Sequence, residues 1–169
     1  MLNWTMILTH SAIYSIVGSI YLVVLLMIDN RMFLTKGDYP DDVLAAVPPR
    51  TKEETRKATI LSLPWFLWSL AVPVYSAFRF AAQAEAMPPY WAVSLHAFLI
   101  FFSFWLVDLV VLDIIMFAGI TPKFVVIPGT EGFPGYKDIG MHLRGHFKTG
   151  LPLLIVLGLV AGGIVWLVG

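Results

Sequence analysis

The segment 135–150, GYKDIGMHLRGHFKTG, places one aspartate and two histidines at four-residue spacing. Asp138, His142 and His146 would share one face of a helix, because residues four apart lie one above the other. Two imidazoles at this spacing can converge on one metal ion, and the aspartate could be a third ligand. The histidines lack the intervening glutamate of a metalloprotease motif. The spacing therefore indicates a divalent-metal site that involves Asp138, His142 and His146.

The same segment has a second interpretation as a helix on the membrane surface. Two further stripes run along it, one basic and one apolar: Lys137, Arg144 and Lys148, and Ile139, Leu143 and Phe147. A helix with a basic and an apolar face lies between headgroups and hydrocarbon, where its histidines would sense pH or contact lipid. The neighbouring cations also oppose metal binding. The stripes thus predict a short interfacial amphipathic helix before the last apolar stretch.

Two other histidines, His10 and His96, lie a few residues inside separate apolar stretches, and Arg79 lies near the end of a third. Imidazoles on facing helices can ligate a haem iron from both sides, and an arginine can pair with a haem propionate. This pattern indicates a haem b site at His10, His96 and Arg79. In the alternative, each histidine bonds a serine, a tyrosine or a backbone carbonyl and holds helices together.

Two aspartates stand within the apolar sequence WLVDLVVLDIIMFAG. Five residues turn an α-helix by about 140°, so we expect Asp108 and Asp113 to lie on different faces and not to act as a pair. Asp108 is a candidate proton relay or cation ligand, because a carboxylate deep in a bilayer is costly. Its alternative is a neutral acid that bonds serines. Asp113 is a second candidate for a proton-relay or ion site, but it lies nearer the interface, and we expect it to pair with a loop lysine or arginine.

The composition indicates an integral membrane protein. The chain is 59% hydrophobic and only 13% charged, against about half and a quarter in soluble domains. Its net charge is zero, which gives no reason to expect nucleic acid as a partner, and the absence of cysteine excludes thiolate chemistry. Hydrocarbon about 30 Å thick needs about 20 helical residues. Four stretches of the single domain qualify as membrane-spanning helices: residues 7–28, 59–82, 91–120 and 151–168.

Lysine and arginine indicate the orientation of the spans. Ten of the 11 lie in the connections 29–58 and 121–150, and Arg79 is the other. Because short cytoplasmic loops are enriched in Lys and Arg, we expect these two connections in the cytoplasm and both termini outside. We therefore predict an all-α four-helix transmembrane bundle in the cytoplasmic membrane of a bacterium or archaeon, in contact with lipid.

Small residues predict where the helices approach one another. Gly158 and Gly162 form a GxxxG pair, which allows close backbone approach within the chain or to a partner subunit or second copy. Ser62, Ser69 and Ser76 recur every seven residues and form one stripe. We expect both motifs to mark helix contacts.

Two function classes follow from these residues. The first is a membrane protein of binding, transport or accessory-subunit type, in which intramembrane aspartates and histidines handle a proton or a ligand. The second is a haem- or metal-binding redox protein or enzyme that uses one of the histidine sets. No complete catalytic constellation can be assembled from the sequence, so we favour the first class.

Overall fold

The computed structural model describes residues 2–168, and these fold into helices and connecting segments. Four helical runs are long and apolar enough to cross a membrane: Trp4–Ile28, Lys52–Ala82, Tyr90–Ile120 and Ile139–Val168. This confirms the prediction of an all-helical chain with four spans. The direction in which the spans cross the membrane stays a prediction.

The first two runs are the uninterrupted α-helices α1 (Trp4–Ile28) and α3 (Lys52–Ala82). The third is α4 (Tyr90–Val107), which continues as the π-helix η1 (Asp108–Ile120). The fourth consists of α5 (Ile139–Gly145), the π-helical turn η3 (His146–Gly150) and α6 (Leu151–Val168). The short elements α2 (Asp41–Ala46) and η2 (Pro134–Lys137) lie in the connections.

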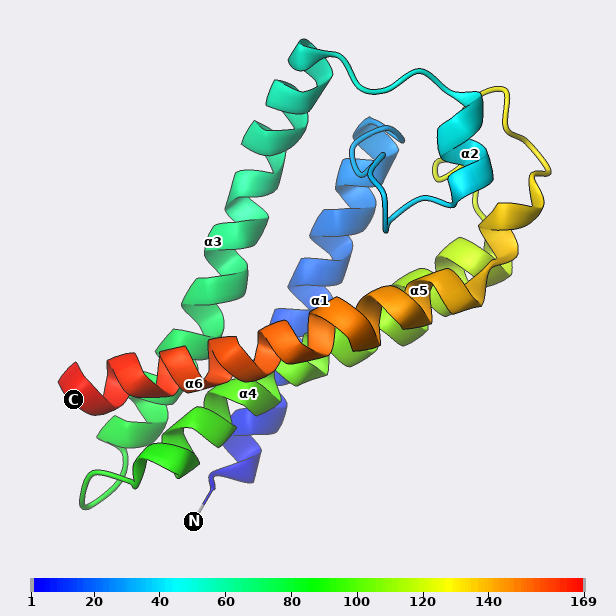
Figure 1. The fold of residues 1–169 in the computed structure, drawn as a ribbon. Helices are drawn as coiled ribbons and strands as arrows, with labels where there is room; N and C mark the ends of the chain where they lie inside the picture. Colours follow the sequence, from blue (N-terminus) through cyan, green and yellow to red (C-terminus); the bar gives the residue numbers. More distant parts are fainter. Residues whose placement is uncertain (1, 169) are drawn as a thin grey trace.

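Two span boundaries differ from the prediction. The second span begins at Lys52 instead of residue 59, because the Thr51 side chain and Glu54 form a capping box that starts the helix there. The fourth begins at Ile139 instead of residue 151. The segment predicted as a separate interfacial helix is helical, but it continues through η3 directly into α6 (Figure 1). Its basic, histidine and apolar stripes thus belong to one end of the fourth span.

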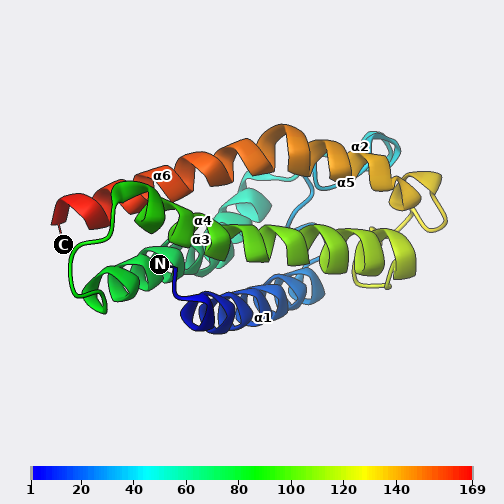
Figure 2. The same ribbon diagram turned by 90° about the horizontal axis from the view of Figure 1, so that it is seen from below.

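The four runs are packed closely at one end of the bundle and diverge at the other (Figure 1). α1 begins and α6 ends at the first end, here called the terminal end. The other end, here called the loop end, holds the connections on either side of α2 and η2. α4 and α6 run side by side, and α1 packs beside α4 (Figure 2). α3 leaves the other helices toward the loop end, so the helices leave space between them there.

The two long connections fold against each other and close the loop end. Their shared core contains Tyr39 and Val43 from the first connection and Val125, Ile127 and Tyr136 from the second. The Tyr39 hydroxyl lies 2.8 Å from the carbonyl oxygens of both Asn30 and Val125. The connections are therefore an ordered cap, in which buried hydroxyls satisfy backbone groups of the opposite segment.

The glycine pair of α6 packs against α4 of the same chain. A Cβ atom at Gly158 would lie 2.8 Å from Phe98 Cβ, and one at Gly162 would lie 2.1 Å from Ser94 Oγ and 2.6 Å from Ser94 Cα. Only hydrogen fits at these distances, so the two glycines bring the backbones together as GxxxG pairs do. The predicted helix contact is thus found within the chain, and a contact between subunits through these glycines stays a prediction.

We predict that Gly162→Ala destabilises the bundle by about 1–3 kcal/mol, because the added methyl group must push α4 and α6 apart. The matched control is Gly163→Ala, whose Cβ would meet only a Tyr90 ring atom at 3.8 Å. Unfolding by SDS titration in mixed micelles measures both free energies of unfolding. Equal stability of the two variants would contradict the packing described here.

Candidate functional site

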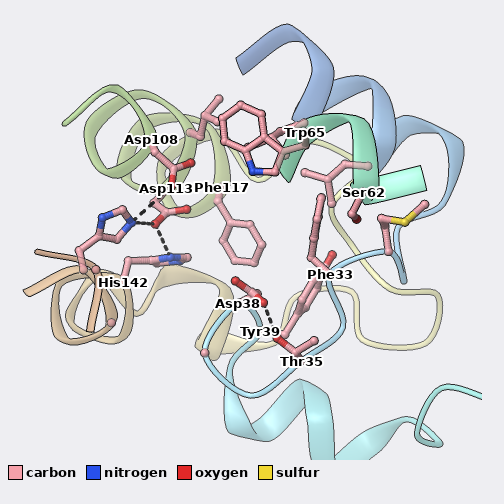
Figure 3. A pocket seen from close by; sticks show the side chains of 18 of the residues that line it. Phe33, Thr35, Asp38, Tyr39, Ser62, Trp65, Asp108, Asp113, Phe117 and His142 are labelled. Atoms are coloured by element: carbon pink, nitrogen blue, oxygen red, sulfur yellow. Dashed lines mark hydrogen bonds and ion pairs between the residues drawn. The ribbon is translucent and has the colours of Figure 1, made fainter. Parts of the chain in front are cut away.

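A cavity of about 740 Å³ lies between the diverging helices at the loop end. Its walls come from α1, α3, η1, α5 and η3, and the first connection contributes Phe33, Thr35 and Asp38 (Figure 3). Most of the lining is aromatic or aliphatic, including Trp65 and Trp105. The cavity thus combines apolar walls with a cluster of acidic and histidine side chains, namely Asp38, Asp108, Asp113, His142 and His146, and its lining also includes Lys36 and Arg50.

Asp113 is the centre of this cluster. Its Oδ2 atom lies 3.0 Å from His142 Nδ1 and 2.9 Å from His146 Nε2 (Figure 3). An ionised carboxylate only accepts hydrogen bonds, so both imidazole nitrogens donate. Asp108 Oδ2 lies 3.7 Å from the same His146 Nε2. One imidazole therefore faces two carboxylates, while the other is buried against one of them.

The π-helix explains why the two aspartates face the same imidazole. Asp108 and Asp113 are the first and sixth residues of η1, and a π-helix repeats its hydrogen bonds every five residues. Residues five apart thus lie nearly above one another instead of about 140° apart. The prediction that these aspartates occupy different faces is wrong, because it assumed α-helical geometry. The expectation that Asp113 pairs with a loop cation is also wrong, since two histidines of the fourth span bond it.

His142 and His146 come together as their spacing predicted, but Asp138 does not join them. Asp138 caps α5 by accepting from Met141 N at 3.0 Å and lies 3.3 Å from Arg144 Nη2. Within residues 2–168, no group of three or more His, Asp or Glu side chains is arranged to hold a metal ion. The structure therefore gives the predicted metal site at these residues no support.

At the terminal end, His10 and His96 meet across a serine. Ser76 Oγ lies 2.7 Å from His10 Nδ1 and 2.8 Å from His96 Nε2, and the Phe80 ring stacks on His96 with centroids 4.6 Å apart. Arg79 is exposed on α3. These contacts match the alternative of histidines that join helices, here α1, α3 and α4. They give no support to haem ligation, because one nitrogen of each ring is directed at the Ser76 hydroxyl that joins the two histidines.

Two residues of the cavity were not identified from the sequence. Asp38 reaches it from the first connection, where the Thr35 hydroxyl bonds its carboxylate. The surrounding protein displaces water and raises the pKa of Asp38 above its usual value, an effect that Thr35 opposes. Trp105 Nε1 donates to the His146 carbonyl oxygen at 3.3 Å and holds η3 against α4. Neither role can be recognised from the neighbouring sequence, because both depend on how the cap and the fourth span pack against the other helices.

Comparison with protein-family models, with curated proteins and with solved structures finds no match to this chain. The interpretation of the site therefore rests on its own geometry.

The contacts of Asp113 predict the tautomers of two histidines. Because a carboxylate accepts only, neutral His142 must carry its proton on Nδ1 and neutral His146 on Nε2. We expect ¹⁵N NMR of histidine-labelled protein in micelles to show these two opposite tautomers. We also expect Asp113→Ala to remove the preference of both rings, whereas Asp138→Ala leaves it unchanged. Identical tautomers at both positions in the wild-type protein would contradict the arrangement.

Proposed function

We propose that this chain is a membrane protein of binding or transport type. In this proposal the cavity at the loop end admits a small solute, and the Asp108–His146–Asp113 cluster in its wall takes up and releases protons. The observation that carries the proposal is the position of His146 Nε2 between two carboxylates in a cavity wall, 2.9 Å from Asp113 and 3.7 Å from Asp108. A proton can move between this imidazole and either carboxylate with little movement of the other atoms.

The two carboxylates have different roles in this proposal. Asp113 uses one oxygen for both histidines, so its hydrogen bonds fix the positions of α5 and η3 relative to η1. The Asp108 carboxylate makes no hydrogen bond to any residue among 2–168, although it lines the cavity. A carboxylate without a hydrogen bond in a membrane helix is costly. We therefore assign proton binding, or contact with a hydrogen-bond donor of the solute, to Asp108.

The cavity has the dimensions and composition of a small-molecule site. Ligand pockets usually measure about 300–1,000 Å³ and combine apolar walls with a few convergent polar groups. Here the volume is about 740 Å³, and Trp65, Trp105 and Phe66 supply flat apolar surface in the same cavity as the acidic cluster. A solute with a donor or a positive charge at one end and an apolar body suits this lining.

The charges support a position on the cytoplasmic side. The two connections at the loop end hold ten of the 11 lysine and arginine residues, counting the first turns of α3 and the fourth span. By the positive-inside rule we place the loop end in the cytoplasm and the terminal end outside. The solute would thus enter the cavity from the cytoplasm or from the inner half of the bilayer.

Infrared difference spectroscopy between pH 8 and pH 5 tests the proposal on purified protein in micelles. We expect a carboxylic acid C=O band that Asp108→Asn removes, because Asp108 is the group to which the proposal assigns proton binding. Asp138→Asn is the matched control, since Asp138 is exposed and its cap bond to Met141 survives as an amide. If the Asp108→Asn spectrum equals that of the wild-type protein, Asp108 is not the exchanging group and the proposal fails.

A further inference from the structure

We propose that the two polar clusters are the ends of one hydrated proton path, so that the protein conducts protons between the two faces of the membrane. The path begins at His10, Ser76 and His96, follows serines of α1 and ends at Asp108 and His146. This inference rests on the proposed function for its inner end, where protons are exchanged with the cavity. It adds an access route from the opposite face and an activity, proton conduction.

The terminal-end cluster has the chemistry of a proton relay. A serine hydroxyl has one hydrogen, so Ser76 can donate to one imidazole only while it accepts from the other. His10 takes up a proton at Nε2 from the terminal face and gives its Nδ1 proton to Ser76 Oγ, while the hydroxyl passes its own proton to His96 Nε2. No atom is gained or lost, and the two hydrogen bonds reverse direction. His96 then releases its other proton from Nδ1.

That Nδ1 atom is one of several buried groups that point to internal water. His96 is 0% exposed, and its Nδ1 has no hydrogen-bond partner among residues 2–168. Ser11 is 8% exposed and, like Ser19, has a buried Oγ without a partner in the same residues. His146 Nδ1 at the other end is in the same situation. Buried polar atoms without protein partners usually bind ordered water, so the bundle interior has several groups that require it.

These serines form a ladder between the two clusters. Ser11, Ser15 and Ser19 recur every four residues on α1 and therefore share one face. Four residues of α-helix rise about 6 Å, which is close to the length of two hydrogen bonds through one water molecule. Ser15 Oγ also lies 3.4 Å from Ser103 Oγ of α4, so the ladder faces the helix that carries both His96 and Asp108.

The ladder ends at the cavity. α1 and α4 start from the same end of the bundle and run in the same direction (Figure 2), and the pair of Ser15 and Ser103 sets their register. Ser19 lies about 6 Å beyond Ser15, and Asp108 lies about 7.5 Å beyond Ser103. Leu22 and Val23, which follow Ser19 within one turn, already line the cavity. Water at Ser19 is thus at the depth of Asp108.

A purely structural role does not account for this arrangement. Ser69 and Ser103 satisfy their hydroxyls on their own helices, by donating to Phe66 O at 2.9 Å and to Ile100 O at 2.7 Å. Membrane serines commonly use such back-bonds. Ser11 and Ser19 form none within residues 2–168, although the same option exists on α1. Their hydroxyls remain available to water, as a proton path requires.

Proton flux into proteoliposomes tests the path. The purified protein is reconstituted with a pH-sensitive dye inside, and a potassium gradient with valinomycin drives proton entry. We expect a flux above that of protein-free vesicles, which the double variant Ser11→Ala, Ser15→Ala reduces at least tenfold, as does Asp108→Asn. The matched control is Ser69→Ala, whose hydroxyl is exposed and bonds its own helix. We expect it to keep the wild-type flux within twofold.

Two results would overturn the path: a wild-type flux no greater than that of empty vesicles, or an undiminished flux in the double serine variant. If the double variant does not fold, Ser19→Ala takes its place, because Ser19 is only partly buried and its hydroxyl precedes the cavity. The infrared experiment separates the two proposals. An Asp108 band without flux supports proton exchange at the cavity and contradicts the path. If the wild-type protein shows no band that depends on Asp108, both proposals fail.

Discussion

The hydrogen bonds from His142 and His146 to Asp113 determine the shape of the loop end. They join the fourth span to η1 at a level farther toward the loop end than the Gly158 and Gly162 contacts, where Trp105 and Phe117 also pack against the two rings. A shared carboxylate requires both imidazoles to approach one oxygen atom, so the positions of α5 and η3 follow from it. The cavity wall, the exposure of Asp108 and the contact with Trp105 all depend on this junction.

The change from the α-helix α4 to the π-helix η1 contributes to the same junction, because η1 carries Asp113. Both helices that meet at Asp113 contain π-helical turns, η1 and η3, and these turns face the cavity. π-Turns are uncommon and concentrate at functional sites, because they move side chains out of the α-helical register. In η1 the result is that two carboxylates occupy one face. Pro152, which lacks a backbone donor, is the second residue after η3 and favours irregular helix at that point.

The sequence predicted the elements of this structure better than their junctions. Span number and type follow from apolar length, and the Gly158–Gly162 contact follows from residue size, since both properties are local. The spacing of His142 and His146 also correctly indicated that the two rings converge. Their partner was predicted incorrectly, as was the relation of Asp108 to Asp113. The causes differ: Asp138 caps α5 instead of lying within the helix, whereas an α-helical period was applied to Asp108 and Asp113 in a stretch that is π-helical. Asp38 and Trp105 could not be identified, because their roles depend on the folding of long connections.

The polar residues of the bundle differ in how many of their hydrogen-bonding atoms have a partner in the protein. This difference separates structural groups from functional ones. A membrane interior gives no solvent to an unpaired group, so residues that only join helices should have their hydrogen bonds complete. Tyr21 meets this condition with Leu61 O at 2.7 Å, and Asp113 meets it with two imidazoles. Ser11 and Ser19 do not meet it within the described chain, and Asp108 has an ion pair with His146 at 3.7 Å but no hydrogen bond there. Ser11 and Ser19 share one face of α1 with Ser15, which lies beside Ser103 of α4, so these hydroxyls are where the proposed path requires them.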